Sequence, residues 1–125
     1  QKGCTQIDTD QWPVQISLVP KSAPFLKSAD LLIVSDCVPV AYPNFHSLLR
    51  GKKILLGCPK LDDSGAYIEK LAGIFKESKP KSITIAIMEV PCCSGMKKIV
   101  EEAIAVSGMK IPVKTVTVGI KGNIK

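Results

Sequence analysis

Four of the five cysteines could act together as sulfur ligands, because each follows an apolar segment at a comparable place. Cys37 follows LLIVSD, Cys58 follows ILLG, and the adjacent residues Cys92 and Cys93 follow IMEVP. Thiolates are the ligands that iron–sulfur clusters, zinc and Cu(I) prefer. A shared site requires the three segments to end at one place in the fold.

The segments before these cysteines have the length and composition of buried strands. DLLIVSD, KKILLGCP and SITIAIMEV are nearly continuous apolar runs, as expected of strands that are covered on both faces. Residues 14–18 and 113–120 alternate between apolar and polar types, which predicts two edge strands. Two amphipathic helices are predicted from apolar residues at helical spacing: Ile68, Leu71, Ala72 and Phe75, then Met96, Ile99, Val100 and Ala103.

Strands that alternate with helices predict an α/β fold. We expect a three-layer α/β/α sandwich with a mostly parallel five-stranded sheet of the Rossmann or flavodoxin type. Residues 1–11 are interpreted as a polar leader or the end of a linker, and residues 12–125 as a single domain. In a parallel sheet the strand ends that precede the cysteines share one edge, and open α/β proteins bind their ligands there.

Several other residues lie near this predicted edge. A proline stands within two residues of every cysteine group, which favours stiff loops. Asp36 and Asp62 are interpreted mainly as caps, with tuning of the site as the alternative. His46 is interpreted as a surface or capping group rather than a ligand, and Cys4 in the leader as incidental.

The spacing of the cysteines favours an iron–sulfur cluster over a structural zinc site, because no two of them form a C-x-x-C pair. Zinc remains the alternative. Cys92 and Cys93 can both bind one centre only if the chain turns near Pro91 and Gly95; otherwise one of the two is structural, and the sequence does not say which. Metal-free thiol chemistry, with Cys92 or Cys93 as nucleophile, and cysteines buried as small apolar residues are further alternatives.

Composition narrows the class of protein. Lysine and arginine total 17, with Arg50 the only arginine, and the net charge is +6. Such a surface favours an acidic protein partner, whereas one arginine and few aromatic residues argue against nucleic acid. No apolar run reaches the ~18 residues that a membrane span needs. The odd number of cysteines argues against a secreted disulfide framework, so we expect a cytoplasmic protein; a homodimer is left open.

Three stretches carry a resemblance to a known family. DCVPVAYPNFH, LLGCPKLDD and MEVPCCSG resemble the signature stretches of a family of iron–sulfur proteins from anaerobic bacteria and archaea, in which a ferredoxin-type domain precedes a domain similar to this one. The similarity runs from about Trp12 to Gly122. It implies a 4Fe-4S cluster held by Cys37, Cys58, Cys92 and Cys93, and electron transfer with a ferredoxin-type domain or partner.

The chain departs from that family in one respect. The closely spaced cysteines of a ferredoxin domain are absent, so we expect a fragment or a stand-alone domain. The leading hypothesis is a redox module that binds an iron–sulfur cluster. A metal- or cluster-dependent enzyme acting on a small substrate is the alternative, so whether the protein is an enzyme stays open. Neither G-x-G-x-x-G nor a P-loop occurs, so nothing indicates a nucleotide site.

Overall fold

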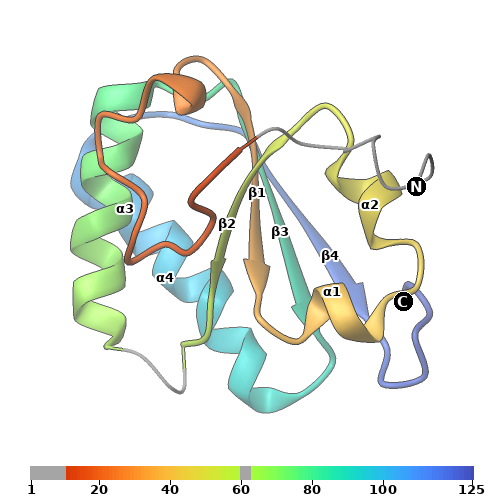
Figure 1. Cartoon of the computed structure of the whole chain (residues 1–125). Coiled ribbons are helices and arrows are strands. Elements are labelled where there is room, and N and C mark those ends of the chain that lie inside the picture. Colours follow the sequence, from red (N-terminus) through yellow and green to blue (C-terminus); the bar gives the residue numbers. More distant parts are fainter. Residues whose placement is uncertain (1–10, 60–62) are drawn as a thin grey trace, which may run out of the picture.

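The structure, a computed structural model, describes residues 11–59 and 63–125, and the side chains of residues 91–94 lie outside the described part. A parallel sheet lies between helices (Figure 1), which confirms the predicted α/β class. The strands are β1 (Asp30–Ser35), β2 (Lys53–Gly57), β3 (Ser82–Met88) and β4 (Val113–Val118). The helices are the 3₁₀ turn η2 (Pro24–Leu26), α1 (Val38–Ala41), α2 (Phe45–Leu49), α3 (Ser64–Ser78) and α4 (Pro91–Ser107).

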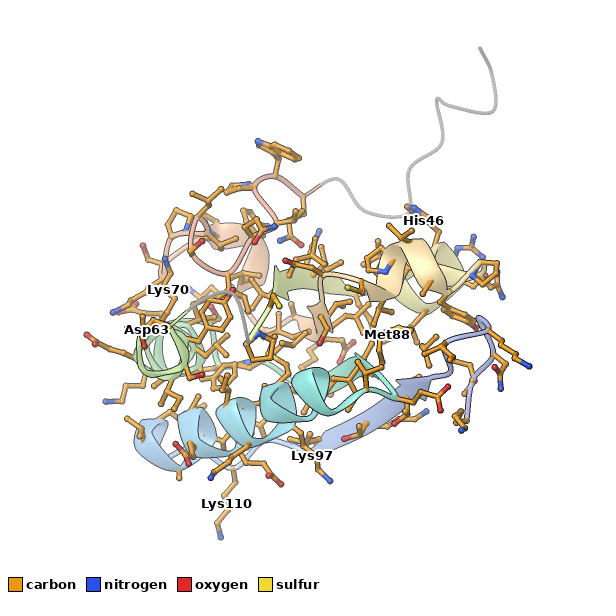
Figure 2. The ribbon with its side chains drawn as sticks, turned by 90° about the horizontal axis from the view of Figure 1, so that it is seen from below. His46, Asp63, Lys70, Met88, Lys97 and Lys110 are labelled. Carbon is orange, nitrogen blue, oxygen red and sulfur yellow. The ribbon has the colours of Figure 1, made fainter. Side chains whose placement is uncertain are left out.

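The strand order, which the sequence left open, is β2-β1-β3-β4, and all three neighbouring pairs are parallel. Helices α3 and α4 pack against each other on one face of the sheet. Helices α1 and α2 lie on the other face (Figures 1 and 2). All strand arrows in Figure 1 point to its lower edge, where α1 and α4 begin. We call this edge, beyond the C-terminal residues of the strands, the carboxyl edge.

The central strands form the core because their apolar runs are covered on both faces. Residues 31–35 of β1 and 83–88 of β3 are buried throughout. The predicted helical stripes face the same core: Leu71, Ala72 and Phe75 of α3 are buried, as are the four named residues of α4. Helix α3 also buries Tyr67, which the spacing argument had not included.

The predicted five-stranded sheet has four strands in the described residues, because segment 14–18 leaves the sheet almost at once. Gln15 forms an isolated parallel bridge with Leu56 at the outer edge of β2. The carbonyl oxygen of Gln15 then accepts hydrogen bonds from the N–H groups of Leu18 and Val19, each at 3.0 Å. This turn takes Leu18 away from the sheet and leaves it 65% exposed.

Gln11, which the sequence placed in the polar leader, is part of the fold. Its side-chain amide pairs with the outer edge of β2 as another strand would. Nε2 donates to the carbonyl oxygen of Ile54 at 2.6 Å, and Oε1 accepts from the N–H of Ile54 at 2.7 Å. Gln11 is therefore buried, whereas the other residues assigned to the leader, 1–10, lie outside the described part.

Three of the four ends of the long helices α3 and α4 carry residues suited to those positions. Asp63 caps α3 by accepting from the N–H groups of Gly65 and Ala66. Helix α4 begins at Pro91 and ends at Ser107, and Gly108, with a φ of 71°, is its C-cap. Within the described residues, no helix combines the length and apolar character that a membrane span requires.

Candidate functional site

The cysteine groups follow three neighbouring strands of the sheet. Cys58 comes directly after β2, Cys37 lies two residues beyond β1, and Cys92 and Cys93 lie in the first turn of α4, after β3. Because β1 lies between β2 and β3 and all three are parallel, each group lies at the carboxyl edge. Neighbouring strands are about 4.8 Å apart, so these chain segments are close enough to share a small ligand.

The same edge contains the topological switch point of the sheet. From β1 the chain crosses to β2 through α1 and α2 on one face. From β3 it crosses to β4 through α4 on the opposite face. Chain segments that leave adjacent strands toward opposite faces open the crevice in which open α/β proteins bind ligands. Cys37 follows one of these strands, and Cys92 and Cys93 follow the other.

Cys58 is held in place by Tyr67 of α3. Its N–H donates to the hydroxyl of Tyr67 at 3.2 Å. The Tyr67 ring lies on Gly57: a β-carbon at Gly57 would stand 2.5 Å from the tyrosine oxygen and 2.7 Å from Cζ. A larger residue at position 57 would therefore have to displace the Tyr67 ring, which holds the end of β2 from the α3 side. Cys58 itself is half-buried.

The segment after Cys58 lies against the beginning of α4. A β-carbon added at Gly95 would be 3.6 Å from Cβ of Pro59, which is ordinary van der Waals contact. Strands β2 and β3 are not neighbours, so this contact joins two cysteine-bearing segments that the sheet alone keeps apart. Gly95 is two residues from Cys93.

Cys37 is exposed and is the N-cap residue of α1. Its carbonyl oxygen accepts from the N–H of Ala41 at 3.0 Å. Helix α1 has only 4 residues and includes Pro39 in its first turn. Pro39 therefore lies in the first turn of a short helix at the centre of the carboxyl edge.

Cys92 and Cys93 follow Pro91, the first residue of α4. The chain therefore turns at the place where binding of one centre by both cysteines would require it to turn. Their side chains lie outside the described part, and the choice between them therefore stays open. In the part of the chain that is described, no three His, Cys, Asp or Glu side chains form a group that could hold a metal. Of the four predicted ligands, Cys37 and Cys58 are the two whose side chains are described.

Of the other residues that the sequence singled out, two are described and two are not. His46 is on the outer surface of α2 (Figure 2), and its ring packs edge-on against Phe45, with centroids 5.8 Å apart. Asp36 is exposed directly after β1. Asp62 and Cys4 lie among residues that are not described, and Asp63 is the cap of α3.

Two surface hollows lie near the beginning of α3, at the end of the sheet where the cysteines lie. One, of about 270 Å³, lies beside Tyr67 and is also lined by Ser17, Asp63, Ala66 and Lys70. Asp63 and Lys70 are on the same side of α3 in Figure 2. The other, of about 310 Å³, lies between α3 and α4 and is lined by Ser64, Ile68, Gly95, Lys98, Ile99 and Glu102. Both therefore lie next to segments that carry or contact a cysteine.

Sequence reasoning missed Ser35 as a functional candidate. It is the last residue of β1, only 1% exposed, and its hydroxyl has no hydrogen-bond partner among the described residues. The available signal was a serine at the end of an otherwise apolar run, two residues before Cys37. That signal also fits an ordinary strand end, so it does not single out Ser35.

A glutamate fixes the far side of the carboxyl edge. Glu89, after β3, accepts from the N–H of Ile120 at 2.6 Å and pairs with Lys125 at 2.8 Å. The hydrogen bond from Lys125, followed by that from Ile120, lowers the pKa of Glu89 below its usual 4.5. These bonds attach the C-terminal loop to the segment between β3 and α4.

The parallel strand order and the switch point define an open α/β protein of the Rossmann class. A family model described as "Rossmann-like domain" matches residues 23–125, and the chain belongs to this family. The matched residues include Cys37, Cys58, Cys92 and Cys93. The chain is also similar to a protein of Archaeoglobus fulgidus named "Uncharacterized protein", with 35% identity over 96 residues, 77% of this chain and 68% of the relative. No solved structure matches the chain.

Proposed function

We propose that this chain is a redox module that holds an iron–sulfur cluster at its carboxyl edge. The ligands would be Cys37, Cys58 and one or both of Cys92 and Cys93. One observation carries the proposal: the cysteine groups follow three adjacent parallel strands, on both sides of the switch point. Ordinary buried cysteines have no reason to gather at this edge, whereas the ligands of a shared metal centre must.

The chemistry of the strand ends fits thiolate ligation better than nucleotide binding. Dinucleotide-binding members of this class place a glycine-rich turn and a helix N-terminus after their first strand. Here the corresponding turn contains Cys37 and Pro39, and the helix that follows has only 4 residues. A cysteine, whose sulfur is a soft donor, therefore stands at the position that would accept a pyrophosphate.

A bound cluster supplies one-electron transfer, and the protein sets its potential through ligation, burial and hydrogen bonds to sulfur. Tyr67 fixes the backbone of Cys58 through the 3.2 Å bond to its N–H. The first turn of α4 offers backbone N–H groups and the positive end of a 17-residue helix, which favour anionic thiolates at Cys92 and Cys93.

The surface charge supports an acidic electron carrier as the partner. A net charge of +6 raises the rate of encounter with an acidic protein, and this effect weakens as salt increases. A ferredoxin-type domain or protein is the partner that we propose, with the cytoplasm as the location. Zinc is the alternative metal.

The test is anaerobic purification, followed by an absorption spectrum and assays of iron, acid-labile sulfide and zinc. We expect a brown protein with stoichiometric iron and sulfide. Cys37→Ser and Cys58→Ser should each reduce cluster content, whereas Cys4→Ser, the matched control, should not. A protein that stays colourless after anaerobic reconstitution, with zinc or without metal, contradicts the cluster.

Metal-free thiol redox chemistry is a second candidate, favoured by the contact between Pro59 and Gly95. That contact brings the Cys58 segment against the beginning of α4, where Cys92 and Cys93 lie. Oxidation of two thiols to one disulfide would release two electrons and two protons, which a partner disulfide takes up as it is reduced to two thiols. A metal-free protein that forms a Cys58 disulfide reversibly would favour this candidate over the cluster.

A further inference from the structure

We propose that the Ser35 hydroxyl is a positioning group of the thiolate site, which donates a hydrogen bond to a ligand sulfur once the metal centre is bound. The inference rests on the proposed function and extends it to a residue outside the cysteine set. It starts from a buried hydroxyl that has no hydrogen-bond partner among the described residues.

The register of the sheet determines the direction in which Ser35 points. Ser35 is the partner of Gly57 in the parallel pairing of β1 with β2. Partners in a parallel pair project their side chains to the same face of the sheet. A β-carbon at Gly57 would point at Tyr67 of α3, so the Ser35 hydroxyl also lies on the α3 and α4 face. It lies level with Gly57, one residue before Cys58.

The Ser35 hydroxyl, which has no hydrogen-bond partner among the described residues, lies in apolar surroundings. Leu31 and Ile33 precede it on the same face of β1, and both are fully buried. A buried hydroxyl without a partner destabilises the folded chain, and alanine would avoid this cost. A ligand at the carboxyl edge gives the hydroxyl an acceptor and accounts for serine at this position.

Thiolate sulfur is a suitable acceptor for this hydroxyl. A hydrogen bond to a ligand sulfur reduces the negative charge that the sulfur donates to the metal, and this raises the reduction potential. A donor within the sheet is also fixed by the backbone of the central strand. Ser35 would therefore orient a ligand and tune the centre without binding the metal.

The protein contains a matched control. Ser78, the last residue of α3, is also buried, at 3% exposure, and its hydroxyl likewise has no partner among the described residues. Its carbonyl oxygen accepts from the N–H of Ser28, just before β1, so Ser78 lies at the end of the sheet opposite the cysteines. Removing its hydroxyl repeats the chemical change away from the site.

The experiment compares Ser35→Ala and Ser78→Ala with the unchanged chain. Thermal unfolding of the metal-free proteins should show neither variant less stable than the unchanged chain, because each loses an unpaired hydroxyl. Co²⁺, monitored by its thiolate charge-transfer absorption, should bind Ser35→Ala about 10–100-fold more weakly, the usual effect of losing such a supporting group. Ser78→Ala should bind Co²⁺ as the unchanged chain does. After anaerobic reconstitution with iron and sulfide, the reduction potential should fall only in Ser35→Ala.

Each unfavourable result has a distinct meaning. Equal Co²⁺ affinity and equal potential in Ser35→Ala and the unchanged chain would overturn the role of Ser35 while leaving the proposed site intact. A Ser35→Ala variant less stable than Ser78→Ala without metal would mean that the hydroxyl already has a protein partner, which also overturns it. If the unchanged chain takes up neither Co²⁺ nor a cluster, the proposed function fails, and this inference with it.

Discussion

Pro59 lies against Gly95, with 3.6 Å between the proline Cβ and the position that a β-carbon at residue 95 would take. The relationship joins the end of β2 to the beginning of α4 across the central strand β1. Cys58 precedes one of these residues and Cys93 lies two residues before the other. The contact therefore fixes the relative position of two cysteine-bearing segments.

Substitutions at Gly95 should test this contact. Gly95→Ala should raise the free energy of unfolding by about 0.5–1 kcal/mol, because the new methyl fits at 3.6 Å and alanine favours the helix. Gly95→Ile should lower it by about 1–3 kcal/mol, since the longer side chain has to displace Pro59. Urea unfolding measures both, and alkylation of Cys58 should be faster only in the isoleucine variant. If Gly95→Ala lowered the free energy of unfolding, the Pro59 and Gly95 segments would have to lie closer together than the 3.6 Å contact indicates.

Tyr67→Phe should loosen Cys58 while keeping the ring on Gly57. The variant removes the oxygen that accepts the Cys58 N–H, so we expect a loss of about 1 kcal/mol. Hydrogen exchange at the Cys58 amide should become faster, whereas exchange at the Leu56 amide, which is bonded to Val14, should change little. Tyr42→Phe on the opposite face is the control. Unchanged exchange at Cys58 would contradict the positioning role of Tyr67.

The carboxyl edge could be predicted because each βα unit has the same local order. Strands β1, β2 and β3 are each an apolar run that is followed by a cysteine group with a nearby proline and then by a helix. Parallel pairing brings these equivalent positions together. The strand order could not be predicted, since the three apolar runs are nearly interchangeable and packing decides which of them is central. The switch point between β1 and β3 therefore required the structure.

Two local errors have specific physical causes. Alternating residues at 14–18 predicted an edge strand, but hydrogen bonding to the Gln15 carbonyl turns the chain after one bridge. The polarity of Gln11 suggested a solvated leader, whereas its amide satisfies both polar backbone groups of Ile54. Periodicity and composition describe burial, but they do not reveal which polar groups pair with one another.

The C-terminal loop should lose stability in acid through Glu89. The pKa of Glu89 is below 4.5 in the folded chain, because Lys125 and the N–H of Ile120 bind the carboxylate. The stability that the ionised Glu89 carboxylate adds to the folded chain is therefore fully present above pH 4.5. It is lost as the pH falls through the lower pKa of the folded state. The Ile120 amide resonance, followed from pH 7 to 3, should report this loss. Glu89→Gln should remove the titration, and a transition that persists in this variant would assign it to another group.

The side chain of Gln11 should contribute to stability as a short section of edge strand. Gln11→Ala should lower the free energy of unfolding by about 1–3 kcal/mol, because the N–H and carbonyl groups of Ile54 lose their partners. Gln11→Glu should also destabilise at neutral pH, since it retains the acceptor but places a carboxylate oxygen against the Ile54 carbonyl. Acid should partly restore this variant, because the protonated carboxyl can donate again. Trp12→Ala, at a side chain 81% exposed, is the matched control and should change stability by less than about 0.5 kcal/mol. If Gln11→Ala and Trp12→Ala changed the free energy of unfolding by the same small amount, the amide pairing of Gln11 would contribute nothing. The β2 edge would then be held by the Gln15 bridge.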